Sequence, residues 1–244
     1  MLSSLSIVIP AYNEAASIAD TVADALAVGT EATNVLEVIV CNDGSSDATA
    51  AIVRAHVDPR VRLLDRDDNR GIEASMRELY AAARHDWVFL MSGDRQWPMQ
   101  VLRPMAEAVD RGADFVVGVR HNKREIYTRY RHALSWSYEQ LVRALGAPGG
   151  DPGSIKLARR RLLHRPLVAD GVFAEGERVI RAAREGARVV EVPVEFRRRA
   201  AGKATGARAH VVARAIVDAG RVASSIALGW PRPTMREPRG TPPS

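Results

Sequence analysis

The chain has 244 residues, of which 46% are hydrophobic and 26% charged, and its formal net charge is +6. This length and composition suit a globular protein with one sizeable core. A basic protein suits nucleic acid, anionic lipid or phosphorylated substrates, but the sequence holds no recognisable nucleic-acid-binding motif, so we do not expect nucleic acid as a partner.

Strands and helices alternate through the first half of the chain. Short apolar, β-branched runs predict buried strands at residues 5–9, 36–41, 61–64, 87–91 and 115–119. The stretches between them predict helices at residues 13–28, 46–56, 72–83 and 99–111. Ser46 is placed to cap the second of these helices. The alternation predicts an α/β fold, with a mostly parallel sheet, right-handed crossovers and flanking helices.

The second half breaks this alternation with a longer helical stretch at residues 125–145. The stretch combines aromatic residues with arginines, and two interpretations stay open. One is a helix packed on the sheet with an exposed basic face. The other is a helix at a substrate site or a membrane interface, where such residues are favoured. Beyond it we expect a strand at 154–157, a helix at 171–185 and a last strand at 189–196.

The chain ends in an amphipathic pattern followed by a proline-rich tail. Residues 207–228 predict an amphipathic helix whose apolar stripe contains Val212, Ile216, Ala219, Ala223 and Ile226. Such a stripe favours docking on the chain's own surface over anchoring in a membrane. Residues 231–244 contain five prolines and are predicted to be disordered. We therefore expect one domain over residues 1–230.

Three of the predicted strands run directly into polar clusters. The first strand leads into Tyr12, Asn13 and Glu14, the second into residues 42–47, and the fourth into residues 92–96. In open α/β sheets, ligands bind beyond the carboxyl ends of the strands. These polar residues are therefore positioned for chemistry.

The clusters resemble the family 2 glycosyltransferases with the GT-A fold, especially their dolichyl-phosphate mannose synthase-like branch. That family reads I-P-x-Y-N-E, D-D-G-S-x-D-x-T and D-x-D-x-Q-x-P, and this chain reads IPAYNE from Ile9, NDGSSDAT from Asn42 and SGDRQWP from Ser92. Further segments match in order, so the resemblance covers roughly residues 5–225. It implies a single GT-A domain with a Rossmann-like sheet, and inverting transfer of a sugar from a nucleotide-sugar donor.

The family pattern assigns residues to the donor. It implies that Pro10, Tyr12 and Glu14 line the nucleoside pocket, and that Asp43 accepts a hydrogen bond from the base or ribose. The alternative for the Asp43 segment is a plain turn followed by a helix cap. Arg70 resembles a donor-side residue, against the alternative of a solvated surface charge.

Asp94 and Gln96 are the candidate metal ligands, because Mg²⁺ and Mn²⁺ prefer hard oxygen ligands. The sequence departs from the family at two aspartates, which are Ser92 and Asn42 here. Each change removes a carboxylate near the expected nucleotide. We therefore predict weaker metal affinity, or a metal held mainly by Asp94 and the diphosphate. Ser92 and Gly93 stay candidates for substrate binding.

The basic run near residue 200 is a candidate phosphate site. Arg199 and Lys203 lie where the family has an R-x-x-G-x-S/K segment. Arginine forks suit phosphate recognition, so we assign both residues to the diphosphate or to an acceptor phosphate. The alternative is a solvated basic loop.

The acceptor decides which catalytic groups are needed. A lipid monophosphate has a second pKa of ~6 and arrives as an anionic nucleophile, whereas a sugar hydroxyl needs a carboxylate general base. Asp151, Glu175 and Glu177 are candidates for that base or for orienting the acceptor, and Asp94 completes the candidate catalytic set. Glu175 and Glu177 equally suit charges at a helix N-terminus.

The favoured acceptor is a polyprenyl phosphate, as in the branch that the chain resembles. Transfer to a hydroxyl of a glycan or small metabolite is the alternative, and a weakened nucleotide-sugar-binding protein is an alternative of another class. Cys41 is the only cysteine, which favours a reducing compartment. With no secretory signal and no stretch of ~18 apolar residues, we expect a cytoplasmic protein with possible peripheral contact to the inner membrane face.

Overall fold

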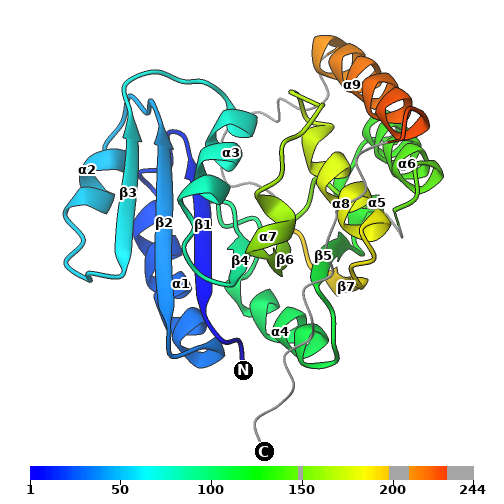
Figure 1. The fold of residues 1–244 in the computed structure, drawn as a ribbon. Helices are drawn as coiled ribbons and strands as arrows, with labels where there is room; N and C mark the ends of the chain where they lie inside the picture. The colour runs from blue at the N-terminus through cyan, green and yellow to red at the C-terminus, as the bar shows by residue number, and fades with distance from the viewer. Residues whose placement is uncertain (148–150, 198–208, 230–244) are drawn as a thin grey trace, which may run out of the picture.

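One seven-stranded sheet organises the protein (Figure 1), in the computed structural model that describes residues 1–147, 151–197 and 209–229. The strand order is β3-β2-β1-β4-β6-β5-β7. The strands are β1 (Leu5–Ala11), β2 (Leu36–Asp43), β3 (Val61–Arg66), β4 (Trp87–Leu90), β5 (Phe115–Arg120), β6 (Lys156–Arg159) and β7 (Val189–Val194). The helices are α1 (Ile18–Ala32), α2 (Thr49–Arg54), α3 (Ile72–Ala82), the 3-10 helix η1 (Met99–Val101), α4 (Leu102–Asp110), α5 (Lys123–Ile126), α6 (Arg129–Ala144), α7 (Arg160–Leu163), α8 (Ala174–Arg184) and α9 (Ala209–Ala227).

The sheet is covered on both faces, which explains the continuous apolar runs of its central strands. Alternate residues of β1 face opposite ways, so Ile7 and Ile9 pack with α1 and α4 while Val8 packs with α3 and α8. β1 pairs in parallel with β2 and β4, and β5 pairs in parallel with β7. The predicted α/β class and mostly parallel sheet are confirmed.

β6 is the exception, because it runs antiparallel to both of its neighbours, β4 and β5. It begins at Lys156, two residues later than predicted. In the register with β4, Lys156 lies opposite Leu90, the last residue of that strand. The antiparallel strand therefore brings a lysine to the carboxyl end of β4, beside the predicted donor residues.

Two helix starts differ from the prediction. α1 begins at Ile18 instead of residue 13, because Asn13 has the left-handed φ of 55° and its side chain binds the next loop. Ser46 does not cap α2, which begins at Thr49. The Ser46 backbone N–H donates to Asn13 Oδ1 at 2.9 Å, and the Thr49 backbone N–H donates to Asp47 Oδ1 at 2.9 Å.

The C-terminal helix α9 packs on the protein itself. Ala219 and Val222 are buried, and the Asp218 carboxylate accepts the Gly171 backbone N–H at 2.8 Å. The predicted docking stripe is wrong at Ile216, which is 65% exposed. Among the described residues, no helix has both the length and the apolar character needed to cross a membrane. The tail predicted at 231–244 lies outside the described residues.

Candidate active site

The polar clusters that follow β1, β2 and β4 lie along one edge of the sheet, here named the donor edge (residues 10–14, 42–47 and 92–96). β1 lies between β2 and β4 and is parallel to both, so the three carboxyl ends meet. Gly93 lies against the end of β1, where an added Cβ would be 3.3 Å from the Pro10 carbonyl oxygen. Ser17 Oγ also donates to the Gly93 carbonyl oxygen at 2.9 Å. The loop that carries Asp94 is thus fixed beside the first motif.

The first two loops of the donor edge are joined by hydrogen bonds from backbone N–H groups of the first to side chains of the second. The Asn13 N–H donates to Ser45 Oγ at 2.9 Å, and the Glu14 N–H donates to Thr49 Oγ1 at 2.8 Å. The polar residues of the IPAYNE and NDGSSDAT motifs therefore build a common rigid unit. Of the three residues assigned to the nucleoside, Tyr12 is half exposed at 49%, while Pro10 and Glu14 are half-buried.

Asp43 is buried beneath this unit and organises the turn that leads into α3. One carboxylate oxygen accepts Arg66 Nη1 at 2.8 Å and the Arg70 N–H at 3.0 Å, and the other accepts the Gly71 N–H at 2.8 Å. Gly71 has φ 87°, in the region that favours glycine. Asp43 therefore fixes the neighbouring turn of the donor edge. Its contact with a base or ribose stays a prediction.

Arg70 and Asn42 have distinct surroundings. The Arg70 side chain is 61% exposed and pairs with Asp68 at 3.1 Å. Asn42 donates from Nδ2 to Asp65 Oδ1 at 2.8 Å and accepts the Ser45 N–H at 3.3 Å. An aspartate at position 42 would place two carboxylates against each other. This contact gives a structural reason for one of the two departures from the family pattern.

Asp94 is bound by its own loop. Ser92 Oγ donates to Asp94 Oδ1 at 2.6 Å, and the Gln96 backbone N–H donates to the same oxygen at 3.2 Å. The Gln96 side-chain amide donates to the Arg197 carbonyl oxygen at 3.0 Å. In the described part of the chain, no group of three or more His, Cys, Asp or Glu side chains is placed to hold a metal. The residues fit a divalent metal only with a single protein carboxylate and with oxygens from a substrate.

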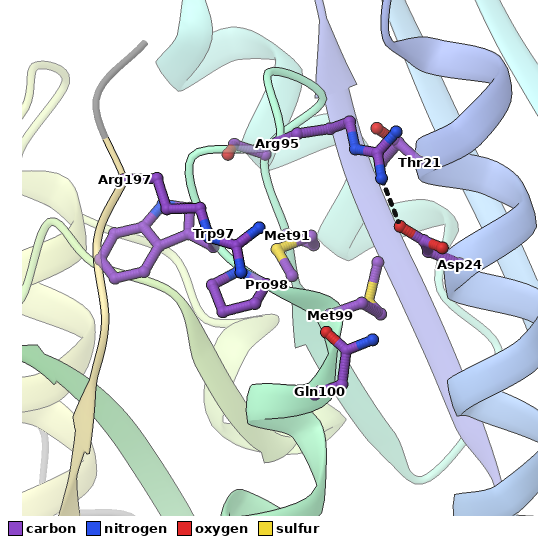
Figure 2. A pocket seen from close by; sticks show the side chains of 10 residues that line it. Thr21, Asp24, Met91, Arg95, Trp97, Pro98, Met99, Gln100 and Arg197 are labelled. Atoms are coloured by element: carbon purple, nitrogen blue, oxygen red, sulfur yellow. Dashed lines mark hydrogen bonds and ion pairs between the residues drawn. The ribbon is translucent and has the colours of Figure 1, made fainter.

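The Arg95 side chain is directed towards α1. It has φ 54° and forms ion pairs with Asp20 and Asp24 of α1. Figure 2 shows its guanidinium beside Asp24, at a cavity of about 240 Å³. The cavity is lined by Thr21, Asp24, Met91, Ser92, Arg95, Trp97, Pro98, Met99, Gln100 and Arg197. Arg95 is therefore paired with carboxylates of α1. Its positive charge does not take the place of a metal ion beside Asp94.

Glu175 lies in a buried ion-pair cluster at the start of α8. Its carboxylate binds Lys156 Nζ, accepts Arg178 Nε at 3.1 Å and accepts the Tyr80 hydroxyl at 3.2 Å. Burial favours the neutral acid, but Lys156 and Arg178 hold the pKa of Glu175 below its ordinary value. Glu175 is therefore ionised and fully engaged, an arrangement that suits orientation more than proton abstraction.

Asp151 is also held by two cations, whereas Glu177 binds backbone N–H groups. Asp151 is buried, accepts Arg120 Nε at 2.6 Å and lies 3.1 Å from Lys123 Nζ. Burial opposes its charge, yet the two cations hold the pKa of Asp151 below its ordinary value. Glu177 accepts the Val168 and Ala169 backbone N–H groups at 2.9 and 2.7 Å. The base role of these carboxylates stays a prediction.

Helices α6 and α9 lie side by side (Figure 1), and residues of both line a groove of about 350 Å³, here named the α6–α9 groove. Its lining is mainly apolar and consists of Arg120, Tyr127, Arg131, Leu134, Ser135, Ser137, Tyr138, Leu141, Gly153, Val172, Val211, Val212, Ala215 and Ile216. Arg120 is paired with Asp151, but Arg131 has only the Tyr127 ring, at 4.2 Å, and no carboxylate partner among the described residues. An apolar groove with an unpaired cation suits an anionic amphiphile.

Sequence reasoning missed several of these residues. Arg66, Arg120, Lys123 and Lys156 pair with buried carboxylates, and Arg131 lines the groove. The sequence contained one signal for two of these residues, the rarity of lysine. Lysine occurs only at positions 123, 156 and 203, and the first two are buried in ion pairs. Predicted residues Arg199 and Lys203 lie outside the described residues.

Comparison with known proteins places the chain in a family. The model of glycosyl transferase family 2 matches residues 6–165, well over half of the chain. The chain belongs to glycosyl transferase family 2. The family predicted from the sequence is therefore confirmed, and the protein is a glycosyltransferase.

The curated relatives of this family 2 member include enzymes named for lipid phosphates. A dolichyl-phosphate hexose transferase of Haloferax volcanii is 28% identical over 80% of this chain and 84% of that protein. An undecaprenyl-phosphate 4-deoxy-4-formamido-L-arabinose transferase of Aeromonas hydrophila is 30% identical over 64% of this chain and 49% of its own length. The succinoglycan biosynthesis protein ExoO of Rhizobium meliloti is 40% identical over 43% of this chain, and the match spans only 30% of ExoO.

Solved structures share the fold at low sequence identity. Glucosyl-3-phosphoglycerate synthase of Mycobacterium tuberculosis, in complex with Mn²⁺, uridine diphosphate and phosphoglyceric acid, superposes with a TM-score of 0.69 at 20% identity. The match covers 90% of this chain and 78% of the synthase. The predicted GT-A class is thereby confirmed. Another structure of that synthase holds Mg²⁺ with the same nucleotide.

Proposed function

We propose that this glycosyltransferase moves a sugar from a nucleotide-sugar donor to a polyprenyl phosphate, with inversion at the sugar carbon. The observation that carries the proposal is the α6–α9 groove, in which Arg131 has no carboxylate partner among the described residues and lies beside apolar side chains. A polyprenyl phosphate joins an anionic head to a long apolar chain. The names of two curated relatives support the same acceptor class.

The donor edge is the proposed donor site. The nucleoside would lie against Pro10, Tyr12 and Glu14, with the diphosphate towards the Asp94 loop. Mg²⁺ or Mn²⁺ would be held by Asp94 and diphosphate oxygens, because Ser92 supplies no second carboxylate. The metal, when bound, stabilises the negative charge that develops on the leaving diphosphate. Gln96 would bind the metal through Oε1, since its Nε2 donates to the Arg197 carbonyl oxygen.

The acceptor site is proposed to open towards a membrane surface. Each CH₂ group that the groove buries contributes about 0.8 kcal/mol, so even a short part of a polyprenyl chain gains several kcal/mol there. Tyr130 and Trp136 of α6 are 63% and 59% exposed, and such residues favour the boundary between membrane and water. We therefore propose peripheral contact with the cytoplasmic membrane face.

A hydroxyl acceptor is the second candidate function. It needs a general base, and the buried carboxylates Asp151 and Glu175 are the observation in its favour. Both are bound by two cations, which lowers their basicity. A catalytically weakened binding protein would bind a nucleotide sugar and turn over no acceptor.

Radiolabelled donor separates these functions. We expect label to enter polyprenyl phosphate in detergent micelles and not soluble sugars or phosphorylated metabolites. Arg131→Ala should raise the KM for the lipid about tenfold, equivalent to about 1.4 kcal/mol. Arg129→Ala is the matched control, because Arg129 is exposed on the same helix and does not line the groove. Label in a soluble acceptor alone contradicts the proposal, and so does nucleotide binding without any transfer.

A further inference from the structure

Glu73 lies on α3, between the turn that Asp43 holds at the donor edge and the ion-pair cluster around Glu175. It belongs to the first turn of α3, two residues after Gly71, whose N–H is held by Asp43. Tyr80 follows seven residues later, which is two helical turns and places both side chains on one face of α3. The Tyr80 hydroxyl donates to Glu175 at 3.2 Å. Glu73 therefore faces the ion-pair cluster of α8 from the donor side.

The floor of the groove is built on that same cluster. Lys156 Nζ donates to the Pro152 carbonyl oxygen at 3.1 Å, directly before Gly153 of the groove lining. Tyr138 also lines the groove, and its hydroxyl donates to the Val172 carbonyl oxygen at 3.2 Å. A Cβ on Gly176 of α8 would lie 2.8 Å from the Tyr138 oxygen, so the groove wall contacts α8 closely.

The Glu73 carboxyl is half-buried and makes no hydrogen bond or ion pair with any described residue. The nearby cations already form ion pairs with other carboxylates. Lys156 and Arg178 bind Glu175, while Arg77 lies 3.7 Å from Asp170. A half-buried carboxyl without a protein partner has polar atoms free to bind water or a ligand.

The surroundings of Glu73 keep it neutral. Burial, and then the negative charge of Glu175, raise the pKa of Glu73 to about 8, although Lys156, Arg178 and Arg77 act in the opposite direction. Burial and the charge of Glu73 also raise the pKa of Tyr138. At neutral pH Glu73 is therefore chiefly a carboxylic acid, whose hydroxyl is a hydrogen-bond donor.

We infer that Glu73 is an acceptor-binding residue that donates a hydrogen bond to a phosphate oxygen of the acceptor. This inference rests on the proposed function. In the transfer, a phosphate oxygen bonds to the anomeric carbon, and the bond from that carbon to the diphosphate breaks with its electrons leaving on the nucleotide. Glu73 keeps its proton throughout. An ionised carboxylate at this place would repel the phosphate, whereas the neutral acid binds it.

The pH dependence of acceptor use tests the inference. For the wild type, kcat/KM for polyprenyl phosphate should fall about tenfold per pH unit above pH 8, as Glu73 loses its proton. Glu73→Gln keeps a neutral donor, so it should stay within about threefold of the wild type at pH 7 and lose the alkaline fall. Glu73→Ala should raise the acceptor KM about tenfold with little change in kcat.

The protonation state of Glu73 can also be tested without substrates, through the pH dependence of stability. The unfolded chain gives up this proton near pH 4.5 and the folded chain near pH 8. The folded state therefore holds more protons between these values, and wild-type stability should decline there relative to Glu73→Gln. The difference in Tm between the two should grow from pH 5 to pH 8. Glu107→Gln of α4 is the control, since Glu107 is 67% exposed and pairs with Arg111.

The outcomes separate the inference from the function on which it rests. If Glu73→Gln abolishes transfer, Glu73 is a proton acceptor and the inference is wrong. If the lipid is glycosylated but the variant keeps the wild-type alkaline fall, the inference fails and the function stands. If the wild type does not glycosylate the lipid while the Tm difference appears, the proposed function and the acceptor contact both fail, and only the neutral state of Glu73 is retained.

Discussion

The donor edge and the proposed acceptor side, defined by Asp151, Glu175 and their cations, differ in the main partners of their carboxylates. At the donor edge, Asp43 and Asp94 accept backbone N–H groups of nearby turns, and Asp43 also pairs with Arg66. On the acceptor side, Asp151 pairs with Arg120 and Lys123, and Glu175 pairs with Lys156 of β6 and with Arg178 of its own helix α8. Backbone contacts shape loops, whereas cation contacts hold separate elements together. The donor edge should therefore depend on local geometry, and the acceptor side on charge balance.

The largest expected effect comes from unbalancing the acceptor side. Lys156→Met replaces a fully buried cation with a neutral side chain of similar size. Among the described residues, Arg178 then stays as the one cation paired with Glu175. Breaking a buried pair in this way costs about 3–5 kcal/mol of unfolding free energy. Urea unfolding measures the cost.

Two comparison variants sharpen this prediction. Arg103→Met removes an exposed cation paired with Glu31 and should cost less than about 1 kcal/mol. Adding Glu175→Gln to Lys156→Met should recover part of the loss, because the double variant no longer buries a carboxylate that has lost one of its two cations. Equal losses in Lys156→Met and Arg103→Met would show that charge balance does not support the acceptor side.

At the donor edge, Asp43→Asn is the matching change. The amide nitrogen of asparagine cannot accept a backbone N–H, so either the Arg70 or the Gly71 turn contact is lost and Arg66 loses a buried partner. We expect a stability loss of about 2 kcal/mol. We also expect the Kd for a nucleoside diphosphate to rise about tenfold, because the turn that Asp43 fixes belongs to the donor edge.

Calorimetric titration and urea unfolding of the same variant separate the two roles of Asp43. The control is Asp68→Asn, which changes a carboxylate that is 64% exposed beside Arg70 and should alter neither value by more than about twofold or 0.5 kcal/mol. Loss of stability with unchanged nucleotide affinity would limit Asp43 to a structural role and remove it from the donor site.

The same contrast explains what the sequence predicted. The donor edge was readable because its turns need particular residues at short spacing, such as Gly93 against Pro10 and Asn13 at a left-handed φ. The cluster of Lys156 and Glu175 was not readable, because their contact requires the antiparallel β6 beside β4. The sequence predicted a strand at 154–157, but strand alternation gave no sign that it would lie antiparallel between β4 and β5.

Glu73 illustrates a further limit of the sequence. A glutamate in the first turn of a helix is favoured by the helix dipole, so its position in the sequence does not indicate a functional role. Its unusual state depends on Glu175, 102 positions away, being buried beside it. The apolar groove likewise exists only because α6 and α9, far apart in the chain, line one cavity. The state of Glu73 and the groove both depend on contacts between residues that are distant in the sequence. Residue periodicity does not reveal such contacts.

The smallest expected effect concerns the metal at the donor edge. Ser92→Asp restores the second carboxylate of the family's D-x-D pattern, in a position where Ser92 now donates to Asp94. Two carboxylates repel each other and the diphosphate when no metal is bound, and they attract a divalent cation more strongly. The concentration of Mn²⁺ that gives half-maximal rate should therefore fall about threefold to tenfold, roughly 1 kcal/mol.

Transfer rates across a Mn²⁺ titration, and in EDTA, measure this change. Ser92→Asn is the control, because it has nearly the size of aspartate but carries no charge and should leave the metal titration close to that of the wild type. In EDTA, Ser92→Asp should be slower than the wild type, since its additional negative charge then faces the diphosphate alone. Full wild-type activity in EDTA would eliminate an essential metal, and an unchanged titration in Ser92→Asp would place the metal away from Asp94.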